Sequence, residues 1–264
     1  MANLTRILFI GDIIGRPGRF AVRSLMPSLL SRFKPDVVIA NGENSAGGFG
    51  ITPEIYHELL SLDVDVITSG NHIWDKKEMA GHIAGAPMLL RPANYPPDAP
   101  GKGSIIFECP SGVKVGVISL CGRVFMEALD CPFRKGLENV ERLKEETPVI
   151  FVDMHAEATS EKMAMGWYLA GKVSAVIGSH THVQTSDERI LDGHTAYITD
   201  AGMTGPTDSV IGVEKGLIIK RFLTQVPVRF EVAEEGVEFQ GVFIEVDSES
   251  GRAVKIKRIK EGVG

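Results

Sequence analysis

Few cysteines and no long apolar run occur in this 264-residue sequence. The three cysteines, Cys109, Cys121 and Cys131, form neither a CxxC pair nor a zinc-ribbon spacing, which argues against a thiolate metal site and favours reduced core thiols. The N-terminal apolar stretch is interrupted at Gly11 and Asp12, and no run approaches the ~20 residues that a membrane-spanning helix needs. These absences predict a soluble, cytoplasmic protein without a membrane partner.

Basic charge is also scarce. Lys plus Arg number 28 against 34 for Asp plus Glu, and no basic run would form an extended surface for duplex nucleic acid. Gly11, Gly15 and Gly18 follow an apolar run, but their spacing is not that of a dinucleotide-binding turn, and no P-loop motif occurs. Asp12 would repel a pyrophosphate at the start of the next helix. A small anionic substrate remains open, because metal ions can supply positive charge locally.

What the chain does contain is a series of polar side chains that each follow a short apolar run. They are Asp12, Glu43, Asn71, His155, His180 and His182. In open α/β sheets, ligands bind outside the carboxyl ends of the strands. Oxygen and imidazole donors without a thiolate favour divalent metal ions, with Fe, Mn, Zn and Ni all suited. We therefore predict one shared metal site.

Each of these residues alone has an ordinary structural explanation. A strand-end Asp commonly caps a helix or a turn, and an isolated His155 would more often be a core residue than a ligand. Six such residues at equivalent positions favour the metal site, because the independent structural explanations would all have to coincide. The other histidines, His57, His82 and His194, do not follow a buried strand and are expected to be structural.

Strands and helices alternate over the first two-thirds of the chain, which predicts an α/β fold with a largely parallel, buried sheet. Strands are expected near residues 6–11, 36–41, 65–69, 104–108 and 113–120, with helices near 19–33, 52–62, 76–82, 136–145 and 159–170.

The character of the chain changes after residue 215. Alternating segments such as 239–246 and 254–257 predict antiparallel edge strands or a second sheet. The proline-rich segment 86–103 is expected to wrap the surface, and it and the C-terminal strands are candidate surfaces for a homo-oligomer. No repeat or long linker interrupts the chain, so we expect one domain over residues 1–264.

The ordered motifs resemble those of a known enzyme superfamily. They are Gly11-Asp12, Gly70-Asn71-His72, His155 and Gly178-Ser179-His180-Thr181-His182. This order is similar to that of the calcineurin-like metallophosphoesterases and, within them, the YmdB-like family, and the similarity runs from about residue 6 to about residue 250. The resemblance implies a four-layer α/β/β/α sandwich with mixed sheets and a metal site at the carboxyl ends of the strands.

One departure from the broad superfamily changes the expected ligands. Ile14 stands where the general pattern has a metal-binding histidine. The YmdB-like pattern implies that Glu43 bridges two divalent ions, Fe or Mn foremost, and that Asn44 replaces the missing histidine. One ion would be held by Asp12, Glu43, Asn44 and His182, and the other by Glu43, Asn71, His155 and His180.

A dinuclear centre of this kind predicts phosphodiester hydrolysis by a metal-bridging hydroxide. His72 follows a ligand but lies outside the expected coordination set, which makes it the candidate general acid for the leaving oxygen. Asp75, three residues later, is expected to orient its ring. The family resemblance implies small phosphodiesters, including 2′,3′-cyclic nucleotides, as substrates.

Substrate contacts are predicted less sharply by the sequence. The segment Asp200–Pro206 is either a tight structural turn or a wall beside the metals, in which Thr204 and Gly205 would contact substrate. Arg16 is similarly either a phosphate contact or a surface residue. The alternative to an enzyme is a metal-dependent regulator that binds a nucleotide without turnover, and the presence of His72 favours the enzyme.

Overall fold

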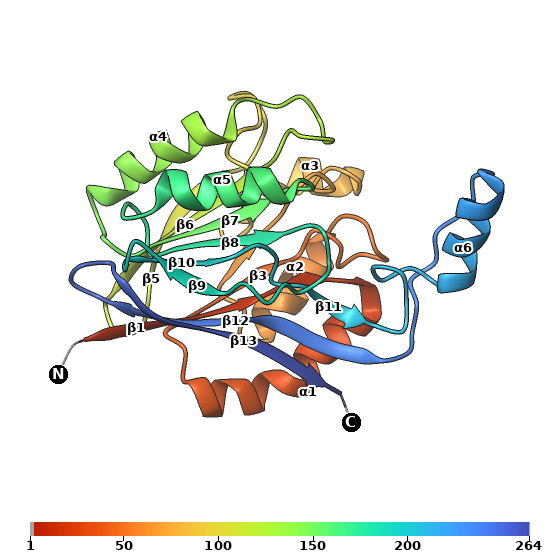
Figure 1. The fold of residues 1–264 in the computed structure, drawn as a ribbon, viewed down its shortest axis with the longest axis horizontal. Coiled ribbons are helices and arrows are strands. Elements are labelled where there is room, and N and C mark those ends of the chain that lie inside the picture. The colour runs from red at the N-terminus through yellow and green to blue at the C-terminus, as the bar shows by residue number, and fades with distance from the viewer. Residues whose placement is uncertain (1–2, 264) are drawn as a thin grey trace.

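The computed structural model describes residues 3–263 and shows a mixed α/β fold with two sheets (Figure 1). The first sheet has seven strands in the order β2-β11-β12-β1-β3-β4, with β13 paired to β12. Its strands are β1 (Leu4–Ile10), β2 (Asp12–Ile13), β3 (Val37–Asn41), β4 (Val66–Thr68), β11 (Met203–Pro206), β12 (Val237–Asp247) and β13 (Ala253–Gly262).

The second sheet has six strands in the order β5-β6-β7-β8-β10-β9. They are β5 (Ser104–Glu108), β6 (Lys114–Cys121), β7 (Ile150–His155), β8 (Ala175–Ser179), β9 (Arg189–Leu191) and β10 (Thr195–Ile198). The four central strands are parallel, while β5 and β9 run antiparallel at the two edges. The carboxyl ends of the parallel strands therefore meet at one end of the sheet.

Three buried apolar clusters join the sheets and the helices. Alternate residues of β1 separate between two of them: Leu8 and Ile10 face α1 and α2, whereas Ile7 and Phe9 face the second sheet. The third cluster lies between the second sheet and the helices α4 and α5, which cover it in Figure 1. The helices are α1 (Gly15–Phe33), α2 (Pro53–Ser61), α3 (Lys77–His82), α4 (Pro132–Lys144), α5 (Thr159–Leu169) and α6 (Lys215–Thr224), with a short 3₁₀ turn at Ile83–Gly85.

The C-terminal strand β12 differs from the sequence expectation. It was expected at an edge or in a second sheet, but it lies inside the first sheet, antiparallel to both β1 and β11. The physical reason is that both of its faces are apolar, with Phe239 and Phe243 in one cluster and Val242 and Ile244 in the other. A strand that is buried on both faces belongs in the interior of a sheet.

Two other segments also refine the expectations. The proline-rich segment is partly internal, since Leu90 packs between the sheets and Asn94 bonds both backbone groups of Cys121. Helix α6, which the sequence did not reveal, projects away from the two sheets in Figure 1, and Ile218 is its one buried residue. None of the helices within residues 3–263 is long and apolar enough to cross a membrane.

Candidate metal centre

The space between the two sheets changes from apolar to polar at the carboxyl ends of the strands. In β3, Val37 and Ile39 pack between the sheets, and in β7 Phe151 does so. With a side-chain period of two, the next inward-facing positions are Asn41 in β3 and Asp153 and His155 in β7. These polar residues are fully buried, so the sequence builds a polar floor at the end of an apolar layer. The floor is made of residues at the ends of these strands and in the loops that follow.

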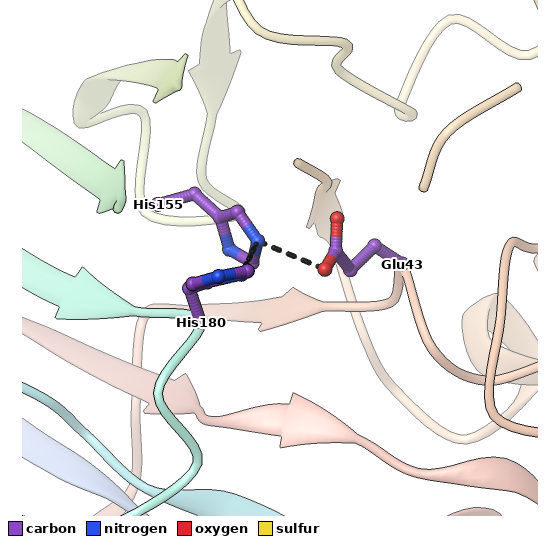
Figure 2. Close-up of side chains that lie close together, drawn as sticks. All are labelled: Glu43, His155 and His180. Atoms are coloured by element: carbon purple, nitrogen blue, oxygen red, sulfur yellow. Dashed lines mark hydrogen bonds and ion pairs between the residues drawn. The ribbon is translucent and has the colours of Figure 1, made fainter. Parts of the chain in front are cut away.

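Three of the predicted ligands converge on one point. The Nε2 atom of His155 lies 2.8 Å from Glu43 Oε1 and 3.0 Å from His180 Nδ1. Figure 2 shows the carboxylate and the two imidazole rings facing one another from three different segments. One ligand atom from each residue lies within 4.8 Å of the others, which is the arrangement that a bound cation requires.

Asp12, Asn44 and His182 lie beside this group. The Nε2 atom of His182 is 3.8 Å from Asp12 Oδ1 and 3.2 Å from the Asn44 side-chain amide. Asn44 also lies 3.3 Å from Glu43 Oε1, so Glu43 stands between the two halves of the cluster. Asn71 and His180 line the same small cavity on the other side.

Two buried oxygen atoms test whether this donor set fits metal ions. The Oδ1 atoms of Asp12 and Asn71 are buried and have no hydrogen-bond partner. A buried acceptor without a partner is costly unless something compensates it. Both atoms belong to predicted ligands: Asp12 Oδ1 lies 3.8 Å from nitrogens of His155 and His182, and Asn71 lines a cavity with His180, a donor set that fits divalent cations.

The electrostatics of the cluster indicate the same need for positive charge. Burial alone would raise the pKa of Glu43, but His155 lowers it to about 2, so Glu43 is an anion. Burial alone would lower the pKa of His155, but Glu43 raises it to about 9. A proton on His155 thus balances the carboxylate in the absence of a cation, and a divalent ion can replace that proton. Burial and His155 lower the pKa of His180 to about 3, which keeps its ring neutral and able to donate a lone pair.

A buried hydrogen-bond chain orients His155. Ser179 Oγ donates to Asp153 Oδ1 at 2.6 Å, so the hydroxyl oxygen is left to accept from His155 Nδ1 at 2.9 Å. Asn41 and Thr68 donate to the other oxygen of Asp153 at 3.0 and 2.5 Å. This chain fixes the ring with Nε2 toward Glu43, which is the usual way in which a second layer of contacts aims a metal-binding histidine.

A buried ion pair holds the loop that carries the other two histidines. His180 and His182 have φ values of +91° and +63°, a region that side chains rarely adopt. Between them, Thr181 donates its backbone N–H and its hydroxyl to Asp200 Oδ2 at 3.1 and 2.6 Å. Lys162, which is 1% exposed, donates to the same oxygen at 2.7 Å. Sequence reasoning missed Lys162, because nothing local in helix α5 indicates its distant partner.

One glycine shows how closely the site is packed. A Cβ on Gly70 would lie 2.0 Å from His155 Cδ2 and 2.4 Å from Glu43 Oε2. No side chain fits there, so the Gly-Asn-His motif needs glycine to bring the β4 loop against the cluster.

Residues 8–259 match the sequence profile of the YmdB-like proteins. This chain belongs to the YmdB-like family. A 2′,3′-cyclic-nucleotide 2′-phosphodiesterase from Bacillus subtilis is 53% identical over 254 residues, covering 96% of each chain. The crystal structure of a hypothetical protein from Thermus thermophilus has a TM-score of 0.91 and 41% identity, covering 98% of this chain and 100% of that one. A novel phosphatase from Mycoplasma pneumoniae also has a TM-score of 0.91, with 34% identity over 99% of this chain and 95% of that one.

In this YmdB-like protein, the cluster opens into a cavity of about 360 Å³. Its floor is polar and includes Glu43, Asn44, His72, His180 and His182. Its opposite wall is largely apolar and comes from segments 211–213 and 230–232, together with Phe49. The cavity therefore combines polar, metal-binding side chains with a largely apolar wall.

His72 lines this cavity beside the cluster. Its Nδ1 atom lies 2.8 Å from Asp75 Oδ2, and its backbone N–H donates to Glu43 Oε2 at 3.2 Å. Phe49 packs edge-on against its ring at 5.1 Å. The ring is thus held from two sides, with its Nε2 atom left free of these contacts.

Glu157 is a further acidic residue at the site that the sequence reasoning did not select. Its Oε2 atom lies 3.0 Å from His180 Nε2 and so orients the ring whose Nδ1 faces His155. Its place two residues after His155 was the available signal.

Three expected substrate contacts do not line the cavity. Thr204 is fully buried in β11, where its hydroxyl donates to the Gln240 carbonyl at 2.9 Å, and Gly205 packs against Ile14. Arg16 lines a separate groove on α1. For Thr204 and Gly205 this placement favours the structural explanation, because β11 pairs with β2 and β12 in the first sheet, and for Arg16 it favours a surface role outside the cavity.

Proposed function

We propose that this protein is a metal-dependent phosphodiesterase that hydrolyses small phosphodiesters, 2′,3′-cyclic nucleotides foremost. The observation that carries the proposal is the convergence of Glu43, His155 and His180 under a cavity large enough for a nucleotide. Support comes from the 53% identical relative from Bacillus subtilis, whose name states that activity. We further propose a single domain that works in the cytoplasm on small substrates.

Two divalent ions would be held by the seven predicted ligands. Asp12, Glu43, Asn44 and His182 would hold one ion, and Glu43, Asn71, His155 and His180 the other, so that the Glu43 carboxylate is shared. Iron or manganese is proposed first, and zinc or nickel also suits these donors. When bound, such ions supply positive charge to the phosphate and lower the pKa of a water.

The charge of the ligands suits an anionic substrate. Asp12 and Glu43 are the two carboxylates among the seven proposed ligands, and the others are neutral amides and imidazoles. Two divalent ions would leave net positive charge at the floor of the cavity. The floor would therefore attract the phosphate end of a cyclic nucleotide.

His72 would act as the general acid. Its Nδ1 atom donates to Asp75, which fixes the ring and leaves Nε2 to deliver a proton to the leaving alkoxide oxygen. Its ring lines the cavity beside the buried cluster, where Nε2 would reach the leaving oxygen of a bound substrate.

The test is hydrolysis of 2′,3′-cyclic AMP and bis-p-nitrophenyl phosphate by protein that has been stripped with a chelator and then reloaded. Turnover should be lost on stripping and restored by Mn²⁺ or Fe²⁺. If the reloaded protein holds its full set of ions and turns over neither substrate, the enzymatic proposal is wrong. A regulator that binds a nucleotide would then be the better account.

A further inference from the structure

The apolar wall of the cavity contains two phenylalanine rings. Phe49 comes from the glycine-rich turn after β3, and Phe230 comes from the segment after α6. Neither ring can bind a metal ion or carry a proton itself, although Phe49 also packs against the ring of His72. Both are half-buried, so part of each ring surface stays open to a ligand.

The two rings are stacked and both line the cavity. Their centroids are 6.4 Å apart and their planes differ by 20°, so the rings are nearly parallel. This separation lies within the range of about 4.5–7 Å for aromatic pairs, so the rings form one aromatic surface, and the half-buried state of each leaves part of that surface to a ligand. Arg221 lies over Phe230 at 4.9 Å from its centroid and so supports this ring from the side of helix α6.

The rest of the wall is consistent with a planar apolar group. Ile211, Val213 and Val232 also line the cavity, with one acidic side chain, Glu231, among them. A ligand with an anionic group for the metal-binding side chains and a flat apolar group for the rings would match this lining. Nucleotides have this division, since the phosphate is anionic and the base is an aromatic plane.

We propose that Phe49 and Phe230 form a base-binding subsite, in which the nucleobase of the substrate stacks while its cyclic phosphate lies over the metal-binding floor. This inference rests on the proposed function, because it assigns the second half of the same substrate. Stacking is tolerant of base identity, because every base has an aromatic face. The subsite therefore selects nucleotides over cyclic phosphodiesters that lack a base.

The experiment compares two substrates with the same reacting group. These are 2′,3′-cyclic AMP and glycerol 1,2-cyclic phosphate, which has the five-membered cyclic phosphodiester but no base. The kcat/KM of each is measured for the wild type, Phe230→Ala, Phe230→Trp and the control Phe20→Ala. Phe20 is half exposed on α1 and does not line the cavity.

The expected result is a change in the ratio of the two kcat/KM values. In Phe230→Ala the ratio of the nucleotide over the glycerol ester should fall about 5- to 100-fold, mainly through KM for the nucleotide. Phe230→Trp should keep the wild-type ratio, and Phe20→Ala should match the wild type. Phe49 is less suited to this test, because its contact with His72 would also change kcat.

Failure of the base-binding subsite and failure of the proposed function give different results. If the wild type hydrolyses both substrates and the ratio is unchanged in a folded Phe230→Ala, the base-binding subsite is overturned while the proposed function stands. If Phe230→Ala does not fold, an unchanged binding constant for 2′,3′-cyclic AMP in Phe230→Leu, which keeps volume but removes the aromatic face, overturns it equally. If the metal-loaded wild type hydrolyses neither substrate, the proposed function fails and this inference fails with it.

Discussion

The floor and the wall of the cavity are built in opposite ways. On the floor and directly beneath it, Glu43, Asp12 and His155 are fully buried at or near strand ends, and each is fixed by contacts from distant parts of the chain. The wall comes from segments on either side of α6, a helix with one buried residue. Residues of both sheets hold the floor, whereas most of the wall lies on the two segments that flank the projecting helix α6.

The rigid floor and the weakly packed wall suit two different tasks of a binding site. Metal ligands must keep their positions within a fraction of an ångström, and buried strand ends supply that rigidity. Recognition of a flat apolar group tolerates adjustment, so it can be placed on a weakly packed segment. The predictions below challenge this contrast from its strongest point to its weakest.

The largest effect is expected for Glu43→Gln on the floor. Glu43 contacts both halves of the cluster, so its loss should remove at least one ion and lower kcat/KM by roughly 10³-fold or more, exceeding the 10- to 100-fold typical of outer-layer partners. Metal content and hydrolysis of 2′,3′-cyclic AMP are measured on the same sample, with the exposed Glu146→Gln as the control. Full metal content with wild-type turnover would show that Glu43 is not a ligand.

His72→Ala should lower kcat by about 10²- to 10⁴-fold while both ions remain bound. The loss should be smallest for substrates with a good leaving group, such as p-nitrophenolate, because these need no acid. His82→Ala, a histidine at the end of α3 outside the cavity, is the matched control. Full turnover of a substrate with a poor leaving group would exclude the acid role.

Lys162→Met tests whether the ion pair under the histidine loop positions the ligands. Leaving Asp200 buried and unpaired should destabilise the protein by about 3–5 kcal/mol and weaken metal binding about 10- to 100-fold. Unfolding in urea and metal titration measure the two effects, with the exposed Lys172→Met as the control. The double variant Lys162→Met/Asp200→Asn should recover stability but not metal affinity. Recovery of both stability and metal affinity would show that the ion pair has only a structural role and does not position the ligands.

The smallest effect is expected on the far side of the wall. Leu223 on α6 is 80% exposed, so Leu223→Ser should change the free energy of unfolding by less than about 0.5 kcal/mol. Turnover should match the wild type in the same assay. A larger loss of stability would mean that α6 is packed against something, and the contrast between floor and wall would need revision.

The sequence predicted the convergence of Glu43, His155 and His180 because the relevant pattern is local. Asp12, Glu43, His155 and His180 each follow a buried strand, and parallel strand ends converge whatever the remaining details of the fold. The mixed α/β class followed from the same alternation. The position of β12 inside the first sheet did not, because two-sided burial depends on partners more than 200 residues away in the chain.

The apolar wall and the contacts that support the metal ligands could not be predicted either, because they also depend on distant segments of the chain. Lys162 lies in α5 and Asp200 follows β10, so their contact depends on how the strands between them pair. Phe49 and Phe230 likewise come from segments that are far apart in the sequence. Thr204 was ambiguous between a turn and a substrate contact, and strand pairing decided for the structural role. Contacts between distant segments determine the roles of these residues, and such contacts leave no pattern in the local sequence.

The most direct test of the central claim is a titration of stripped protein with Mn²⁺ or Fe²⁺, in which ions bound per chain and the rate of 2′,3′-cyclic AMP hydrolysis are measured together. Our account predicts that hydrolysis appears as the chain approaches two bound ions and that Glu43→Gln never reaches that state. Hydrolysis at full rate by the stripped protein, or its absence with two ions bound to the wild type, would contradict it.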